Sequence, residues 1–206
     1  MTPIYIGGRI SMKIAPVSTR TRTMTNLDSY LKSVDRIVSR NDAQYLRIYK
    51  GSNPGQISTC RYEKWPQTGY TTIFSAGLSL FNNPAWKLSR PEIVLTVMSE
   101  DPQWASVLGQ TITESLGKTN YEYGAMIKVP VAMPVGCLMD SICIYRCSVL
   151  DVGQEAINLP DYKVVLSQMY PIYKNEMGLI SKDIQKFFAD EDMDWYDPMR
   201  SPKQSL

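Results

Sequence analysis

The sequence predicts one α+β domain, in which a mixed, mostly antiparallel sheet packs with three main helices. Helical periodicity occurs at the beginning, middle and end of the chain, and runs of consecutive strand-like segments lie between these places. No linker typical of a domain boundary divides the chain after residue 24. With 206 residues, of which 44% are hydrophobic and 20% charged, the chain is long enough to bury a core of its own.

Three stretches carry apolar residues at helical spacing, and each predicts a helix with one buried face. They cover residues 27–38, 104–116 and 173–188. Thr25 or Asn26 is placed to cap the first helix. Asp101 is placed as the N-cap of the second, with Pro102 at the first helical position, and Gly117 is placed to end it.

Seven segments have the composition of β-strands. They cover residues 45–50, 57–64, 70–81, 93–98, 126–135, 141–149 and 162–169. The first two flank a turn rich in Gly, Ser, Asn and Pro, which predicts a hairpin with a longer loop. The segment 93–98 is a continuous β-branched run, so we expect it to be a central strand that is buried on both faces.

The absence of histidine removes whole classes of enzyme. No Ser-His or Cys-His nucleophile pair can form, and no site can use imidazole as a ligand or general base. The net charge of +2 hides an uneven distribution, since residues 1–50 carry nine basic and three acidic side chains while residues 183–197 are mainly acidic. No cluster of Lys and Arg is present, so nucleic acid is not expected as a partner.

No segment approaches 18 unbroken apolar residues, so no membrane-spanning helix and no membrane partner are expected. The start of the chain also lacks an apolar run of signal-peptide length, which predicts a cytoplasmic protein. In that compartment the cysteines are expected to be free thiols that act as small hydrophobes. Because they form no C-x-x-C pair, we expect neither a metal site nor a cofactor. The cysteines are Cys60, Cys137, Cys143 and Cys147.

Two patterns were weighed as signs of an enzyme. Gly117-Lys118-Thr119 matches the end of a phosphate-binding loop, but the glycine that this motif needs five residues before Gly117 is replaced by Ile112. The segment also closes a helix instead of opening one, so a helix C-cap is the better interpretation. Several carboxylates lie in the middle of the chain without any motif, so no catalytic residue is assigned. They are Glu92, Glu100, Asp101 and Glu114.

The most unusual local feature is an acidic segment near the end of the chain that also carries two aromatic residues. One interpretation is a solvated helix end whose aromatic side chains fold back onto the core. The other is a surface that docks a basic protein, because acidic groups steer such a partner and aromatic residues are enriched at interface hot spots. The predicted protein-binding residues are Asp190, Glu191, Asp192, Asp194, Trp195 and Tyr196.

Several segments, in their order and spacing, resemble the suppressor-of-fused family, in its bacterial single-domain form. The segments are Gly77-Leu78-Ser79, the run Arg90-Pro91-Glu92 with residues 93–97, Met169-Tyr170-Pro171-Ile172-Tyr173 with Glu176-Met177, and Asp197-Pro198-x-Arg200. The similarity covers roughly Asn26 to Arg200. It divides the chain into a leader or extended arm at 1–23, a suppressor-of-fused-like domain at 24–200 and a polar tail at 201–206.

The resemblance implies a non-enzymatic protein-binding domain with a mixed α+β fold. Animal members sequester a transcription factor, and bacterial single-domain members are associated with polymorphic toxin systems as immunity proteins. We therefore expect an immunity protein that binds and neutralises a cognate toxin. Two alternatives stay open: a cytosolic hydrolase that uses carboxylates or a cysteine, and a scaffold protein of the same fold without a toxin partner. The sequence leaves the oligomeric state open.

Overall fold

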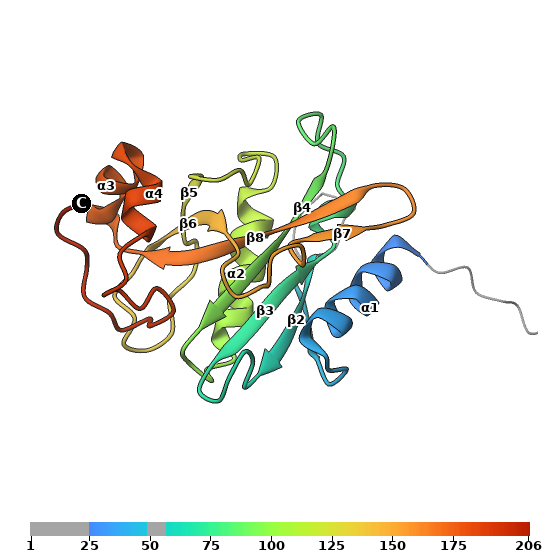
Figure 1. Cartoon of the computed structure of the whole chain (residues 1–206), viewed down its shortest axis with the longest axis horizontal. Coiled ribbons are helices and arrows are strands. Elements are labelled where there is room, and N and C mark those ends of the chain that lie inside the picture. The colour runs from blue at the N-terminus through green and yellow to red at the C-terminus, as the bar shows by residue number, and fades with distance from the viewer. Residues whose placement is uncertain (1–24, 49–56) are drawn as a thin grey trace, which may run out of the picture.

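The computed structural model describes residues 25–48 and 57–206, and within this part of the chain one eight-stranded sheet forms the centre of the molecule (Figure 1). The strands are β1 (Gln44–Ile48), β2 (Ile57–Glu63), β3 (Thr71–Ala76), β4 (Arg90–Val97), β5 (Met126–Lys128), β6 (Ser141–Arg146), β7 (Ala156–Asn158) and β8 (Lys163–Ile172). The helices are α1 (Asn26–Val38), α2 (Gln103–Ser115), α3 (Met177–Lys182) and α4 (Ile184–Phe188), with 3-10 turns η1 (Leu78–Leu80) and η2 (Lys174–Glu176).

The sheet is mixed and mostly antiparallel, as predicted. Its strand order is β1-β2-β3-β4-β8-β6-β5, and β7 pairs with β8 outside this path. The β4–β8 pair is parallel, and the other pairs are antiparallel. The predicted central strand is confirmed, because β4 lies between β3 and β8 and its residues from Pro91 to Val97 are buried.

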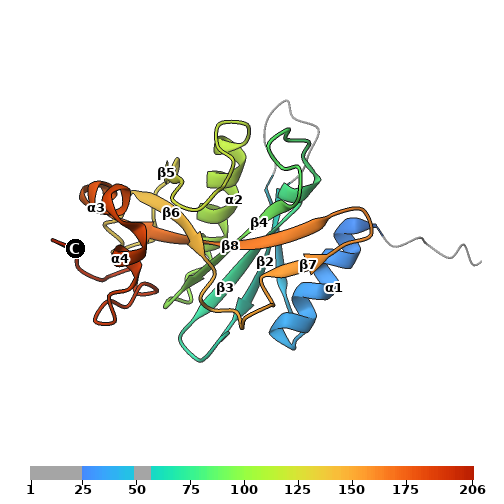
Figure 2. The ribbon, with the colours of Figure 1, turned by 45° about the horizontal axis from the view of Figure 1, so that its top comes forward.

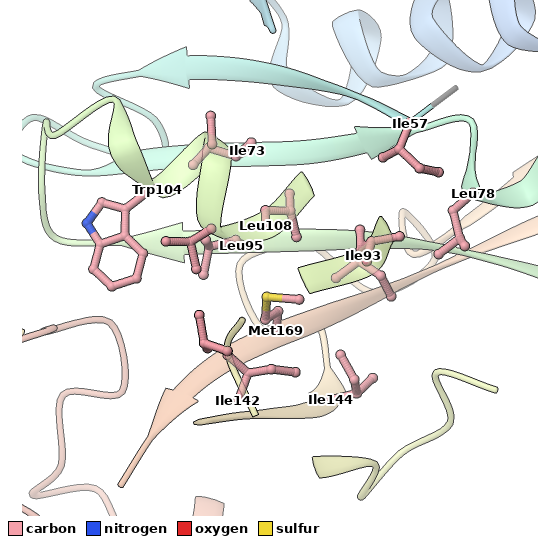
Figure 3. Close-up of a cluster of buried hydrophobic side chains, with 14 of the residues drawn as sticks. Ile57, Ile73, Leu78, Ile93, Leu95, Trp104, Leu108, Ile142, Ile144 and Met169 are labelled. Carbon is pink, nitrogen blue, oxygen red and sulfur yellow. The ribbon is translucent and has the colours of Figure 1, made fainter. Parts of the chain in front are cut away.

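Helices α1 and α2 cover opposite faces of the sheet (Figures 1 and 2). Side chains of successive strand residues point to opposite faces, so β4 contributes Ile93 and Leu95 to the cluster under α2 and Val94 to the cluster under α1. Trp104 and Leu108 of α2 belong to the first cluster together with Ile93 and Leu95 (Figure 3).

Helix α1 is fixed at both ends by local signals. Thr25 and Asp28 form a capping box, in which the Thr25 hydroxyl accepts from the amide of Asp28 and the Asp28 carboxylate accepts from the amide of Thr25. Ser39 ends the helix in the left-handed conformation. Thr25 is therefore the N-cap, which was one of the two residues predicted for this role.

Some element boundaries differ from the predictions. The strand predicted over 70–81 ends at Ala76, where Gly77 has φ 113° and the chain turns into η1. The strand predicted over 126–135 has only three residues, since Pro130 and Pro134 lack the amide that a ladder needs. The short strand β7 was not predicted.

The third predicted helix is divided into η2, α3 and α4. Asp183 interrupts it with an extended backbone at φ −159°, and its carboxylate accepts from the amide of Lys186 as the N-cap of α4. These short helices pack with β6 and β8 in a third buried cluster at one end of the sheet. The last residue, Leu206, packs against the same cluster, so the segment predicted as a polar tail contacts the domain.

Candidate protein-binding surface

The acidic segment follows α4 and forms the loop that leads to the end of the chain (Figure 1). Glu191, Asp192 and Asp194 are exposed. Asp190 is half-buried and pairs with Lys203, which lowers the pKa of the Asp190 carboxyl. The Asp194 carboxylate accepts from the amide of Tyr196 at 3.0 Å. Three of the four predicted acids are thus available to a partner, and the fourth joins the loop to the end of the chain.

Trp195 is half-buried and packs against the third cluster. The centroid of its ring is 4.8 Å from that of Phe187 and 5.0 Å from that of Phe188. The guanidinium of Arg200 lies 4.9 Å from the ring of Trp195, within the range of a cation–π interaction. Trp195 therefore connects the acidic loop to the core, as the first of the two interpretations predicts.

Tyr196 joins the acidic loop to the sheet. Its hydroxyl is 2.7 Å from the hydroxyl of Ser148, and its backbone carbonyl accepts from the amide of Met98 at 2.8 Å. Its ring makes an edge contact with Tyr70, with a centroid distance of 5.9 Å. These contacts hold the loop at the ends of β3, β4 and β6, so the exposed acids extend from a fixed base.

A cleft of about 330 Å³ opens beside this loop, between β6, β8 and α4. Its wall includes Tyr145 stacked on Phe188, with centroids 4.8 Å apart and rings 12° from parallel. Among the described residues the exposed Arg146 side chain has no hydrogen-bond or ion-pair partner. The lining residues are Tyr145, Arg146, Ser148, Tyr170, Gln185, Phe188, Ala189 and Trp195. We refer to this cleft as the aromatic cleft.

The sequence analysis predicted one residue of the aromatic cleft, Trp195, and missed the others. Tyr145 and Tyr170 belong to strands β6 and β8, which pair with each other, and Phe188 comes from α4. Before the fold is known, nothing in the spacing of these residues brings them together. One signal was available, the adjacent pair Phe187-Phe188. Adjacent residues of an amphipathic helix point in different directions, so the pair indicated that the second ring lies outside the buried face.

Two fully buried carboxylates lie in the segments that carry the family resemblance. Glu92 on β4 accepts hydrogen bonds from the amides of Gly77 and Ser79 at 3.0 and 2.9 Å, and from the hydroxyls of Ser79 and Ser75. Burial raises the pKa of Glu92, and these hydrogen bonds partly offset the rise. Arg90 donates to the carbonyl of Ser79, so Gly77-Leu78-Ser79 is held to β4 from two positions.

Glu176 is the second buried carboxylate, and it pairs with a cation. Arg200 donates to both of its oxygens at 2.6 and 2.8 Å, in a two-point contact that is almost closed to solvent. The same oxygens accept from the amides of Tyr173 and Lys203 at 2.9 and 2.8 Å. Arg200 also donates to the carbonyl of Pro171. Two segments that are distant in sequence, residues 171–176 and 200–203, therefore meet at one ion pair.

Neither carboxylate is placed to perform chemistry on a bound molecule. The side chains of Glu92 and Glu176 are fully buried, and protein donors occupy both oxygens of each. A general acid or base must reach its substrate at hydrogen-bond distance, directly or through one water. The geometry of both carboxylates instead supports a role in holding loops to the sheet.

The four cysteines are free, as predicted, and three of them are buried. Burial raises the pKa of both Cys143 and Cys147 to about 12, so these thiols are protonated at neutral pH and are poor nucleophiles. In residues 25–48 and 57–206, no group of three Cys, Asp or Glu side chains is arranged to hold a metal ion. No helix in these ranges has the length and apolar character to cross a membrane.

Comparison by sequence identifies one family. The family model for Suppressor of fused protein matches residues 51–200. This range contains each of the segments that carry the resemblance noted above. No curated protein matches the chain by sequence.

Comparison by structure gives neighbours of low sequence identity but similar fold. The homologue of suppressor of fused protein from Neisseria gonorrhoeae superposes with a TM-score of 0.68 and 13% identity, covering 86% of this chain and 96% of the other. Drosophila Suppressor of Fused gives a TM-score of 0.64 and 14% identity, covering 87% of this chain and 51% of the other. The chain thus spans about half of the Drosophila protein. A chain of the Sufu–Fu complex gives a TM-score of 0.63 and 12% identity, covering 87% and 91%.

Proposed function

The chain belongs to the suppressor of fused family, and from this premise we propose that it is an immunity protein that binds and neutralises a cognate toxin without catalysing a reaction. The observation that carries the proposal is the acidic loop, which presents exposed carboxylates on a base fixed by Trp195 and Tyr196. A protein of this design blocks its target by occupying the target's surface. Such binding needs complementary shape and charge, and no reactive group.

A protein-binding role has support from two directions. One structural neighbour is a chain of the Sufu–Fu complex, so a protein of this fold occurs in a complex with another protein. In the present chain, the exposed Glu191, Asp192 and Asp194 lie in sequence between Ala189 and Trp195, which both line the aromatic cleft. Carboxylates around an aromatic surface suit a basic partner, because the charges accelerate encounter and the rings supply contact area.

The geometry weighs against the hydrolase alternative. Glu92 and Glu176 are fully buried, so no substrate can reach their carboxylates. The partly exposed Cys137 has a raised pKa because of burial, whereas a nucleophilic thiol needs a lowered one. The scaffold alternative shares the binding role and differs only in its partner.

The experiment that tests the immunity role uses the protein encoded directly upstream of this chain's gene. Its C-terminal domain would be produced in a bacterial host with and without this chain, and growth would be measured together with binding by calorimetry. We expect the domain alone to stop growth and this chain to restore it through a stable complex. A harmless upstream product, or a toxic one that this chain neither binds nor neutralises, would contradict the proposal.

We also propose a cytoplasmic location.

We further propose that the domain begins at residue 24, with a leader before it, and that residues 201–206 belong to it, because Lys203 and Leu206 pack on it. For a chain that starts at Met24, the free energy of unfolding is expected to lie within about 1 kcal/mol of the value for the full chain, because the leader carries no apolar periodicity. Denaturant titration of both chains measures this difference. A larger loss of stability would place part of residues 1–23 in the domain.

A further inference from the structure

A pocket of about 340 Å³ lies between the loop that precedes β4 and the loop that follows α2. Its floor comes from the sheet, where Pro91 of β4 is the register partner of Val165 on β8. Ser167, the third floor residue, is the register partner of Ile93. Register partners share a face of the sheet, and Ile93 belongs to the cluster under α2, so the floor lies on the α2 face.

Three aromatic side chains line the walls of this pocket. Trp86 lies against Tyr121, with ring centroids 6.4 Å apart, and Tyr123 is 51% exposed. The indole nitrogen of Trp86 donates to the carbonyl of Asn120 at 3.3 Å. The hydroxyl of Tyr121 donates to the carbonyl of Ile112 at 2.9 Å. Because the polar groups of Trp86 and Tyr121 already have partners in the protein, these two side chains offer a ligand mainly ring surface.

Two polar side chains of the pocket have no partner within residues 25–48 and 57–206. Ser167 is 4% exposed, and no hydrogen bond in this part of the chain engages its hydroxyl. Glu122 is exposed, and its carboxylate takes part in no ion pair or hydrogen bond there. None of the residues that line the pocket is Lys or Arg. The pocket therefore combines aromatic rings, an unpaired negative charge and a buried hydroxyl that lacks a partner.

We propose that this pocket, which we call the amine pocket, binds a primary ammonium group on a short alkyl chain. Aromatic rings attract a cation, and the Glu122 carboxylate supplies the opposite charge. An N–H of the ammonium donates to the Ser167 hydroxyl, which removes the cost of leaving that hydroxyl unpaired. An anion would meet the charge of Glu122, and an apolar ligand would leave Ser167 without a partner. The volume is at the lower end of the usual range for ligand pockets, roughly 300 to 1,000 Å³, which suits a small group.

The test titrates the purified full chain with butylammonium, which copies the end of a lysine side chain, and follows the binding by NMR at constant ionic strength. Shifts are expected at the amides of residues 120–123 and at the indole of Trp86. A ligand with so few atoms should bind with a dissociation constant of about 1 mM. Butanol has the same length without the charge, and pentanoate has the opposite charge. Both should bind at least about tenfold more weakly.

A blocked lysine, Nα-acetyl-lysine methylamide, distinguishes two sources of the ammonium group. If it binds as tightly as butylammonium, the pocket has room for the backbone on either side of a lysine, and a lysine side chain of a protein is the ligand. If butylammonium binds and the blocked lysine does not, the ligand is a free amine.

Variants of exposed residues test the assigned contacts. Glu122→Gln should weaken butylammonium at least about tenfold and leave butanol unchanged, whereas Glu191→Gln removes an exposed carboxylate of the acidic loop and should change neither. Tyr123→Ala should weaken binding, and Tyr123→Phe, which keeps the ring, should not. Circular dichroism checks the fold of each variant.

Arg146 provides a test in the opposite direction. Burial raises the pKa of the Tyr123 hydroxyl, and the positive charge of Arg146 opposes this rise, so that charge acts at the amine pocket. Since like charges repel, Arg146→Ala should strengthen butylammonium binding about twofold, an effect that salt reduces. The absence of shifts at residues 120–123 up to about 50 mM butylammonium, equally tight binding of butanol, or unchanged binding by Glu122→Gln would overturn the proposal. This inference is independent of the proposed toxin partner.

Discussion

Glu92 and Glu176 are both fully buried and both accept hydrogen bonds from backbone amides, but only Glu176 also pairs with a cation among the described residues. Glu92 receives hydrogen bonds from two amides and two hydroxyls, and within residues 25–48 and 57–206 no cation pairs with it. Glu176 receives a two-point contact from Arg200 in addition to two amides. Hydrogen bonds alone leave the charge of Glu92 without compensation, and its pKa rises. For Glu176 the guanidinium supplies the opposite charge in the low-dielectric interior.

The comparison explains what the family segments do in this chain. Gly77-Leu78-Ser79 and Arg90-Pro91-Glu92 close one network, and Tyr173, Glu176 and Arg200 close the other. Both networks are architectural, since they fasten loops to β4 and β8. On the proposed function, the residues that recognise a partner lie outside both networks, on the exposed carboxylates of the acidic loop.

The largest effect is expected from the ion pair. Arg200→Ala leaves the Glu176 carboxylate buried without a cation, and the free energy of unfolding should fall by about 3 to 5 kcal/mol. Denaturant titration measures it. The matched control is Arg146→Ala, which removes an exposed arginine without a partner among the described residues and should change stability by at most about 0.5 kcal/mol. Equal losses in the free energy of unfolding for the two variants would show that the buried ion pair does not stabilise the fold more than an exposed arginine does.

A smaller loss is expected at the other carboxylate. Glu92→Ala removes the acceptor for the Gly77 and Ser79 amides, and each buried donor left without a partner costs about 1 to 3 kcal/mol. Water that enters the space of the lost carboxylate would accept from these amides and offset part of this cost. Glu92→Gln keeps an acceptor oxygen and removes the charge, so it should be tolerated far better at pH 7. Thermal unfolding of the three chains gives the order. If Glu92→Gln is as damaging as Glu92→Ala, the charge itself is needed and the comparison fails.

Trp195→Ala should lower stability by about 2 kcal/mol, because the ring packs on Phe187 and Phe188 and lies against Arg200. The double variant with Arg200→Ala should lose less than the sum of the two single losses, since the residues share one contact. Denaturant titration of the three variants measures this coupling. If Trp195→Ala is as stable as the wild type, the Trp195 ring does not stabilise the fold, and this expectation is contradicted.

The pH dependence should distinguish Glu92 from a solvated glutamate. Because its pKa in the folded state is raised above the ordinary value of 4.5, the folded chain binds the proton more tightly than the unfolded chain does. The resulting stability is fully present below 4.5 and is lost as pH rises through the raised pKa. Lowering the pH from 7 should therefore stabilise the wild type relative to Glu92→Gln. A difference in free energy of unfolding between the two chains that stays the same at every pH would contradict this expectation.

Sequence patterns predicted the α+β fold class and several of its helices and strands, because these elements leave a local periodicity in the sequence. The apolar spacing of 27–38 and the β-branched run at 93–98 each matched an element of the structure. The strand beyond Ala76 was predicted incorrectly, because Leu78 and Phe81 continue an apolar pattern while the Glu92 carboxylate draws the Gly77 and Ser79 amides into a turn. That contact links residues far apart in sequence, and local patterns carry no information about it.

The candidate binding surface also has a part that local composition predicted and a part that depends on tertiary packing. The acids at 191, 192 and 194 were predicted from local composition and are exposed. The orientation of Trp195 depends on Phe187 and Arg200, and the aromatic cleft depends on strands that pair across the sheet. Such features follow from tertiary packing, so they become visible only with the fold.

We propose that in this chain the buried carboxylates of Glu92 and Glu176 stabilise the fold, whereas the exposed carboxylates of the acidic loop recognise the partner. The most direct test is the rate at which Glu191→Lys/Asp192→Lys associates with the cognate toxin domain at low salt, measured by stopped flow beside the wild type. We predict association at least about tenfold slower, a difference that shrinks as salt is added, and a free energy of unfolding within about 0.5 kcal/mol of the wild type. An unchanged association rate in a correctly folded variant would contradict the account and place the binding surface elsewhere.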